Sequence, residues 1–337
     1  MAVRRAFCCD WNKVEDGMVL GDYVDFTTDH KRTGSHSIKL GGWWNDFSDI
    51  FDVHFPEELS EFYYQFAWYL SSITDGTRPI IAWRNKATGA TLGGLKYNHN
   101  TRVLDLYTGD FSTLVASGTK ALDPGNWYVI EVRVKIADTD GVIETRVDMI
   151  ADASFSGDTK PGSETGVDLI RHGNSNHDTY VDDIVLNDTS GTENNSWPGG
   201  VKCYLLRPNG DGTTLDWTPT PSGSHYTTVD DSEPDSSDYL QTNAVDKVDE
   251  LALEDLPAEA QVVRAVVVHF WGQKGSEEAP SRVAVGLKIG GADYYSDDLD
   301  LPTSMQDVSH VFDTNPAGGN WTPDTVNNMN LLIKSRT

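Results

Sequence analysis

Apolar and polar residues alternate with a period of two along much of this 337-residue chain, and this pattern limits the folds open to it. The clearest case is the stretch 127–150. Its first half has apolar residues at every second position, with Glu131 among the polar residues that would face solvent, and its second half repeats the pattern. Such alternation predicts half-buried antiparallel strands. Between the halves, Asp140-Gly141 supplies the positive φ that a tight turn requires, so we predict a β-hairpin here.

Further segments with the same alternation are separated by clusters of Gly, Asn, Asp and Thr, which are typical of turns. They are predicted as strands and cover 37–40, 51–55, 62–70, 79–84, 92–97, 103–107 and 179–186. Many short strands joined by turns are typical of a β-sandwich or jelly roll. The predicted fold class is therefore all-β.

A break in the alternation divides the chain. Residues 187–200 are rich in Asn, Ser, Thr and Gly and have no periodicity, although Trp197 could attach them to a surface. A chain of this length corresponds to about two domains. We predict a first domain over 1–190, a linker over 191–200 and a second, smaller β-rich domain over 201–337.

The second domain is also predicted to be a sandwich, with at most a short helix near the C-terminus. Residues 201–206 predict its first strand, and 208–212, which read Pro-Asn-Gly-Asp-Gly, predict a turn. The stretch 262–271 is apolar on both faces, which is typical of a central strand. Thr322 followed by Pro323 is a signal for the start of a helix.

The charge balance excludes two classes of partner. Lys and Arg total 26 and Asp and Glu total 52, which gives a formal net charge of −26. A protein that follows nucleic-acid phosphates needs a basic stripe, and docking on an anionic membrane needs basic residues as well. No stretch approaches the roughly 18 apolar residues of a membrane span. We therefore expect no nucleic-acid partner and no membrane insertion.

The cysteines point to a reducing compartment. Cys8, Cys9 and Cys203 are the three cysteines of the chain, so one thiol must stay unpaired and no disulfide framework can form. The apolar patch within residues 1–13 is too short for the core of a signal peptide, and Asp10 ends it. We expect reduced thiols and synthesis in a cytoplasm without classical export.

The carboxylates do not form the pair that a glycosidase uses. Retaining glycosidases need two carboxyl groups about 5–5.5 Å apart, a separation that residues two apart on a strand can provide. Glu131 and Glu144 are each followed two residues later by an arginine instead. We therefore predict no catalytic residues and no enzymatic activity. A glycosidase with carboxylates from separate strands remains open as an alternative.

Asp182-Asp183, in the predicted strand 179–186, has two interpretations. Two carboxylates could bind calcium or a glycan, because hard cations prefer oxygen ligands. Alternatively, one is an outward charge and the other an inward carboxylate bonded to loop amides. Neighbouring strand residues face opposite sides unless a bulge intervenes, which favours the second interpretation.

No other pattern predicts a metal or cofactor site. Residues 209–212 resemble half of a calcium loop but lack its terminal bidentate Glu, so a plain turn is favoured. The nine histidines show no zinc-binding spacing. His172 and His177 flank a polar loop, and loop polarity explains them. We therefore expect no metal and no cofactor.

Three tryptophans could contact a sugar. Trp43, Trp44 and Trp83 could form a stacking platform, but paired aromatics in a β-rich chain more often belong to the core. The core interpretation is therefore preferred.

Residues 33–190 resemble the concanavalin A-like, laminin-G-type jelly roll. Five pieces in chain order carry the resemblance, at 34–40, 62–69, 126–132, 141–148 and 180–186. The resemblance implies that the first domain is a concanavalin A-like jelly-roll sandwich.

A narrower resemblance covers nearly the whole chain. It rests on Tyr-Val-Asp-Asp-Ile-Val-Leu-Asn-Asp at 180–188, Asn-Ser-Trp-Pro-Gly-Gly at 195–200, Leu-Arg-Pro-Asn-Gly-Asp-Gly at 206–212, and Trp217. In these features the chain is similar to a family of tailed-bacteriophage virion proteins that pair a concanavalin-like domain with a second β-rich domain. The resemblance implies a structural role on the virion, with other head or tail proteins as partners. It also implies assembly in the host cytoplasm and release by lysis, and it brings no catalytic residues.

Three functions follow from this reasoning. The first is a non-enzymatic, decoration-like accessory protein exposed on the phage head or tail, because the chain has no heptad stalk typical of a trimeric fibre. The second is a tail-associated receptor-recognition protein that binds host surface glycan through the first domain. The third is a glycoside hydrolase of concanavalin-like fold. Whether the chain forms a homo-oligomer is left open.

Overall fold

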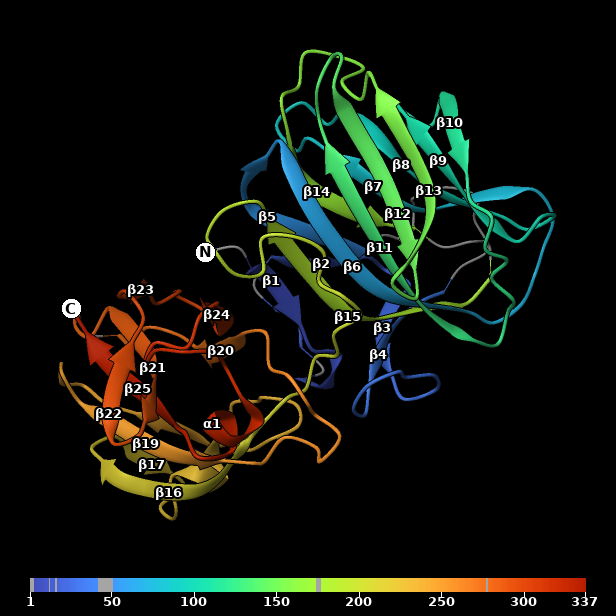
Figure 1. Cartoon of the computed structure of the whole chain (residues 1–337). Helices are drawn as coiled ribbons and strands as arrows, with labels where there is room; N and C mark the ends of the chain where they lie inside the picture. The colour runs from blue at the N-terminus through green and yellow to red at the C-terminus, as the bar shows by residue number, and fades with distance from the viewer. Residues whose placement is uncertain (1–2, 12, 16, 42–50, 174–176, 277) are drawn as a thin grey trace. The chain divides into compact units, whose positions relative to one another are not determined.

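Figure 1 shows the computed structural model of the chain, which describes residues 3–11, 13–15, 17–41, 51–173, 177–276 and 278–337. The fold is all-β, as the sequence predicts, and every strand pair in the described residues is antiparallel. Besides the strands, the described residues contain one short α-helix, α1 (Pro323–Asn327), and two 3-10 turns, η1 (Cys9–Trp11) and η2 (Tyr226–Thr228).

The chain divides into two compact units. The first contains the described residues up to Asp10 and from Gly17 to Cys203. The second contains those from Trp11 to Glu15 and from Tyr204 to Thr337. Residues 191–200, which the sequence analysis assigns to a linker, therefore belong to the first unit.

The first unit is a sandwich of an eight-stranded and a seven-stranded sheet. The eight-stranded sheet runs in the order β13 (Ile150–Gly157), β12 (Gly141–Val147), β11 (Trp127–Lys135), β6 (Glu61–Leu70), β15 (Thr179–Asp188), β4 (Ser37–Leu40) and β3 (Val24–Thr27), with β1 (Val3–Phe7) also paired to β15. The seven-stranded sheet runs in the order β10 (Thr113–Ser117), β9 (Val103–Thr108), β8 (Thr91–Asn98), β7 (Thr77–Arg84), β14 (Val167–His172), β5 (Phe51–Leu59) and β2 (Met18–Leu20).

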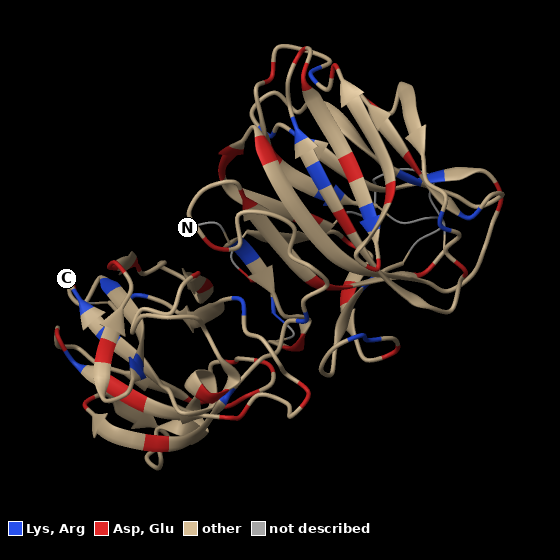
Figure 2. Ribbon diagram, viewed as in Figure 1, with Lys and Arg blue, Asp and Glu red and all other residues tan. Residues whose placement is uncertain are grey.

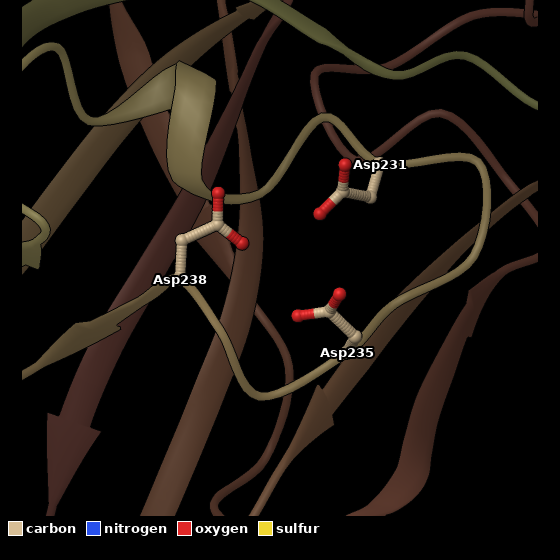
Figure 3. Close-up of side chains that lie close together, drawn as sticks. All are labelled: Asp231, Asp235 and Asp238. Atoms are coloured by element: carbon tan, nitrogen blue, oxygen red, sulfur yellow. The ribbon is translucent and has the colours of Figure 1, made fainter.

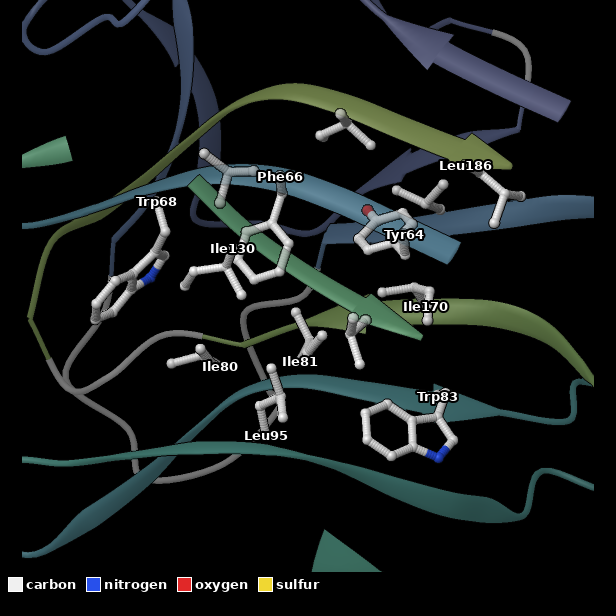
Figure 4. Close-up of a cluster of buried hydrophobic side chains, with 14 of the residues drawn as sticks. Tyr64, Phe66, Trp68, Ile80, Ile81, Trp83, Leu95, Ile130, Ile170 and Leu186 are labelled. Carbon is white, nitrogen blue, oxygen red and sulfur yellow. The ribbon is translucent and has the colours of Figure 1, made fainter. Parts of the chain in front are cut away.

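The core of this unit is filled by alternate residues of both sheets. Tyr64 and Phe66 of β6 point toward Ile81 and Trp83 of β7 (Figure 4). These side chains are at most 1% exposed. Aromatic side chains bury large apolar areas, so they contribute much of the hydrophobic stabilisation of the sandwich.

The predicted hairpin is present as β11 and β12, paired from Ile130–Val147 to Lys135–Val142. The prediction that Glu131 faces solvent is wrong, because the side chain is 0% exposed. Residues 199–201 lie over that face of the sheet. The Gly199 N–H donates to the Glu131 carboxylate (2.6 Å), and Gln65 Oε1 accepts from the N–H groups of Gly200 (2.9 Å) and Val201 (3.1 Å). These bonds attach the expected linker to the first unit.

The second unit is built on a six-stranded sheet. Its order is β16 (Pro208–Leu215), β19 (Val248–Leu253), β25 (Asn330–Arg336), β21 (Arg282–Ile289) and β22 (Ala292–Tyr295), with β23 (Leu299–Asp300) also paired to β21. Two further pairs are β17 (Thr218–Thr220) with β18 (Tyr239–Gln241), and β20 (Val266–Gly272) with β24 (Gln306–Phe312).

Three predictions for this unit need correction. Residues 201–206 form no strand, and the predicted turn at 208–212 is the start of β16. Pro208 is tolerated there because β16 is an edge strand with register shifts, where a missing N–H breaks no regular ladder. The stretch 262–271 is not central, because β20 pairs only with β24 among the described strands. The short helix is confirmed.

Candidate functional site

The outer face of the seven-stranded sheet carries a row of side chains fixed by strand register. Asp52 of β5, Arg171 of β14, Ala82 of β7, Gly94 of β8 and Tyr107 of β9 are aligned across five strands. Most of their chain neighbours belong to the core, so the row lies on the face turned away from it. Ala82 and Gly94, in the middle of the row, have small side chains or none, so the sheet surface is low between Arg171 and Tyr107.

The turn between β9 and β10 folds back over this low part of the sheet surface. Phe111 has a φ of 52°, a left-handed conformation that is rare for a bulky residue. Its ring lies on Gly94, where an added Cβ would come within 2.5 Å of the ring. The Gly109 N–H donates to the Leu92 carbonyl (2.9 Å) and ties the turn to β8. Strained residues persist only where their surroundings hold them, and they often occur at functional sites.

Lys96 of β8 lies beside two aromatic rings. Its Nζ is 4.5 Å from the ring centroid of Tyr107 and 4.8 Å from that of Phe111. The two ring centroids are 6.0 Å apart, with the planes at 63°. Burial lowers the pKa of Lys96, although Asp110 and Asp105 act against this. Lys96 forms no ion pair with any residue that the structure describes.

Arg84, at the end of β7, is a second cation on this face. Its Nη2 donates to the Gly89 carbonyl (2.7 Å), while its Nε is buried without a partner among residues of the described ranges. Burial and the nearby Arg171 lower the pKa of Arg84. We call Arg84, Lys96, Tyr107 and Phe111 together the aromatic–cation face.

At one edge of this face, a carboxylate neutralises one of the cations. Arg171 makes a bidentate ion pair with Asp52, with both N–O distances at 2.8 Å. Lys86 Nζ lies 3.2 Å from Nδ1 of His54. Burial and Lys86 lower the pKa of His54, so it adds little positive charge near neutral pH. The positive charge available to a ligand is therefore that of Arg84, Lys96 and the exposed Lys86.

This arrangement suits binding. Aromatic rings attract C–H groups and cations, and Tyr107 and Phe111 are half-buried, so part of each remains accessible. Cations without ion-pair partners attract anions. A ligand with an apolar face and an anionic group would match both features.

The second interpretation of Asp182-Asp183 is right in part. Both side chains are buried, at 2% and 0% exposure, and a register shift between Asp182 and Val185 allows both to contact the loop at Arg32 and Thr33. Asp182 accepts from the backbone N–H groups of Arg32 (2.9 Å) and Thr33 (3.0 Å). Asp183 pairs with the Arg32 side chain. The predicted carboxylate bonded to loop amides is present, whereas the predicted outward charge is not.

Burial is the main influence on these two carboxyl groups. It acts together with the neighbouring Asp183 to raise the pKa of Asp182 to about 7. Burial also raises the pKa of Asp183, against the guanidinium of Arg32. Because Arg32 and backbone amides already satisfy the oxygens, the pair fits a structural role better than a cation site.

The histidine and tryptophan predictions have mixed outcomes. His172 is not explained by loop polarity, because it is buried in the core with its Nε2 2.7 Å from the Tyr64 hydroxyl oxygen. His177 is half-buried. Trp83 is buried, as the core interpretation predicts, and Trp43 and Trp44 lie outside the described residues.

The acidic loop before β18 brings together three carboxylates that the sequence analysis did not single out. Oxygens of Asp231, Asp235 and Asp238 lie within 4.8 Å of one another, and the three side chains face a common space (Figure 3). Burial and the neighbouring Asp238 and Asp235 raise the pKa of Asp231. Hydrogen bonds from Ser237 lower the pKa of Asp235. Oxygen ligands of this kind could hold a hard cation, but exposed acidic groups often lie together without one.

We predict that the fold needs neither a metal ion nor an oxidant. Chelator and reductant together should leave the melting temperature within about 2 °C, less than the shift expected from losing roughly 1 kcal/mol in a domain of this size. Differential scanning fluorimetry measures this. A larger fall that calcium reverses in the wild type, but not in an Asp235→Asn variant, would contradict the prediction.

The sequence and the structure were each compared with known proteins. No protein-family model matches the sequence, and no curated protein matches it. Among solved structures, the cellulose-induced protein Cip1 is 16% identical, with a TM-score of 0.39 over 57% of this chain and 91% of Cip1. Trypanosoma rangeli sialidase is 19% identical, with a TM-score of 0.34 over 49% of this chain and 27% of the sialidase. The carbohydrate-binding module CBM66 from Bacillus subtilis is 7% identical, with a TM-score of 0.35 over 51% of this chain and 96% of the module.

These likenesses extend over only about half of the chain, and no function follows from them. None of the three proteins is described as a virion protein. Within the described residues, no helix has the length and apolar character needed to cross a membrane.

Proposed function

We propose that the chain is a non-enzymatic accessory protein on the surface of a tailed-phage virion, and that its first unit recognises a host surface glycan. The virion context rests on the sequence features at 180–188, 195–200 and 206–212. The observation that carries the recognition role is the aromatic–cation face, where Tyr107 and Phe111 flank a lysine without an ion pair.

The construction of this face supports a binding role. A phenylalanine ring at φ 52° is held on a sheet surface by a tied turn. Holding a side chain in place before a ligand arrives reduces the entropy lost on binding. Sugar rings present C–H faces that stack on aromatic rings, and their hydroxyl groups accept from charged donors.

Attachment to the particle without glycan binding is the second candidate. It is favoured by the exposed edge strand β13, which could accept a partner strand. The two candidates differ in whether substitutions on the aromatic–cation face change binding to host cells.

A matched pair of tyrosine substitutions tests the recognition role. Tyr107→Ala should weaken binding of the full-length protein to host cells by about 3- to 10-fold, since one aromatic contact contributes roughly 0.5–1.5 kcal/mol. Tyr23→Ala removes a tyrosine that is 61% exposed and should leave binding unchanged. Flow cytometry with labelled protein measures both, and circular dichroism checks that each variant folds.

Two results would count against the proposal. Equal cell binding by both variants, with particle binding retained, would favour the attachment-only candidate. Release of reducing sugar from host polysaccharide, abolished by a single Asp or Glu substitution, would favour the glycoside hydrolase instead.

A further inference from the structure

We infer that the glycan recognised by the aromatic–cation face is acidic, with sugar carboxylates that pair with Lys96 and Arg84 while sugar rings contact Tyr107 and Phe111. This inference rests on the proposed function and specifies its ligand class.

The first argument is the missing counter-charge. Acidic residues outnumber basic ones by 52 to 26, and they are spread over both units (Figure 2). Several other half-buried arginines of the first unit have carboxylate partners, Arg171 among them. Arg133 pairs with Glu61 (2.7 Å) and Glu144 (3.1 Å). Lys96 and Arg84 form no such pair in the described part of the chain, so a ligand can supply the missing anion.

The second argument is the cost of this arrangement in the free protein. Burial disfavours the charged forms of Lys96 and Arg84, as the lowered pKa of each indicates. Arg84 also has a buried Nε without a partner among the described residues. An incoming carboxylate would offset part of this cost, whereas a neutral sugar hydroxyl would offset less of it.

The third argument concerns the kind of anion. Asp110 and Asp105 lie near enough to act on the pKa of Lys96, and Asp52 already neutralises Arg171. A dense phosphate chain would be repelled by these acids. Single carboxylates spaced along a sugar chain match two separate cations in acidic surroundings better.

The test measures how tightly the full-length protein binds three carboxylated polymers, namely polygalacturonate, alginate and polysialate. Each is compared with its carboxyl-reduced counterpart, so the polymers differ in charge and little else. Wild-type protein should bind at least one carboxylated polymer about tenfold or more tightly than the reduced form. Raising salt from 0.05 to 0.3 M should weaken that binding, because screening shortens the reach of exposed charges.

Three variants test whether Lys96 is responsible for the preference for carboxylated polymers. Lys96→Gln should weaken binding to the carboxylated polymer by about tenfold, as expected for the loss of one charge-assisted contact. Lys96→Arg keeps the charge and should recover part of the affinity. Lys31→Gln removes an exposed lysine between β3 and β4, on the other sheet, and should have no effect. Thermal melting confirms that each variant is folded.

The outcomes separate this inference from the proposed function. Equal binding to the reduced polymers, still lost in Tyr107→Ala, would overturn the acidic ligand and leave glycan recognition standing. Failure to bind any of the carboxylated polymers would also overturn the inference. Cell binding that depends on Tyr107 would then preserve the proposed function, and its absence would remove both.

Discussion

Replacing Arg32 with methionine should lower the unfolding free energy of the first unit by about 3–5 kcal/mol, the range for breaking a buried ion pair by removing one partner. The Arg32 guanidinium pairs with Asp183, which is 0% exposed, and also donates to the Val201 carbonyl (3.3 Å). Methionine fills similar volume but leaves the carboxylate buried without its counter-charge. Urea unfolding followed by tryptophan fluorescence measures the loss.

An exposed ion pair provides the control. Arg102 pairs with Asp123, and their side chains are 48% and 54% exposed. Arg102→Met should cost less than about 1 kcal/mol, because water already solvates both charges. A double Arg32→Met/Asp183→Leu variant should recover part of the lost stability, since it removes the orphaned carboxylate. If Arg32→Met lowers the unfolding free energy no more than Arg102→Met does, the Arg32–Asp183 ion pair does not stabilise this region.

Acidification from pH 6.5 to 4.5 should cost the first unit about 2–3 kcal/mol through His172 alone, at 1.36 kcal/mol per pH unit. Burial lowers the pKa of His172 from 6.5 to about 3. Over this range the unfolded chain binds a proton at this histidine and the folded protein does not. Its contribution to stability is therefore fully present above about pH 6.5 and is lost progressively as the pH falls toward 3.

A Tyr64→Phe/His172→Phe variant tests this contribution. It replaces both partners of one buried hydrogen bond with apolar groups of similar shape, so no polar atom of that bond is left unpaired. The raised pKa of Asp182 acts in the opposite sense, since that carboxyl group favours the folded state as the pH falls below about 7. The quantity to compare is thus the slope of unfolding free energy against pH in the two proteins. Equal slopes would show that His172 titrates normally in the folded state.

Alternation in the sequence predicted the hairpin over 127–150 and the strand at 62–70, although both faces of β6 are buried. The sequence prediction missed β14 and β19, which lie between neighbouring strands, and β13, an edge strand with few buried residues and a correspondingly weak pattern. It also mistook 208–212 for a turn, because Pro and Gly are common both in turns and in irregular edge strands.

The aromatic–cation face was not predicted, because it depends on the exact register of three consecutive strands and on the path of the turn that follows them. Which residues lie across from Gly94 is decided by the registers of β7, β8 and β9, and the position of Phe111 by a turn that folds back. One local signal was available. Two adjacent glycines, Gly93 and Gly94, lie within the strand predicted over 92–97, and glycine within a strand often marks the close approach of another group.

The prediction of a linker at 191–200 failed for a related reason. Its polar composition is that of a mobile segment, yet its backbone N–H groups bond to Gln65 and Glu131, which lie on strands far away in the sequence. A polar segment looks the same in sequence whether its partners are water molecules or buried side chains.

The second unit is built from two separate stretches of sequence, and this affects how the chain can fold during synthesis. Trp11 and Glu15 both contact His269, with the Trp11 and His269 rings 4.8 Å apart, so a short piece of the second unit interrupts the sequence of the first. During synthesis all residues of the first unit are available once Cys203 has left the ribosome. The second unit must wait for β25, which lies between β19 and β21 in its sheet and is translated after both. A fragment that starts at Tyr204 would therefore lack an early piece of its own fold, and expression of the second unit alone calls for a design that restores residues 11–15.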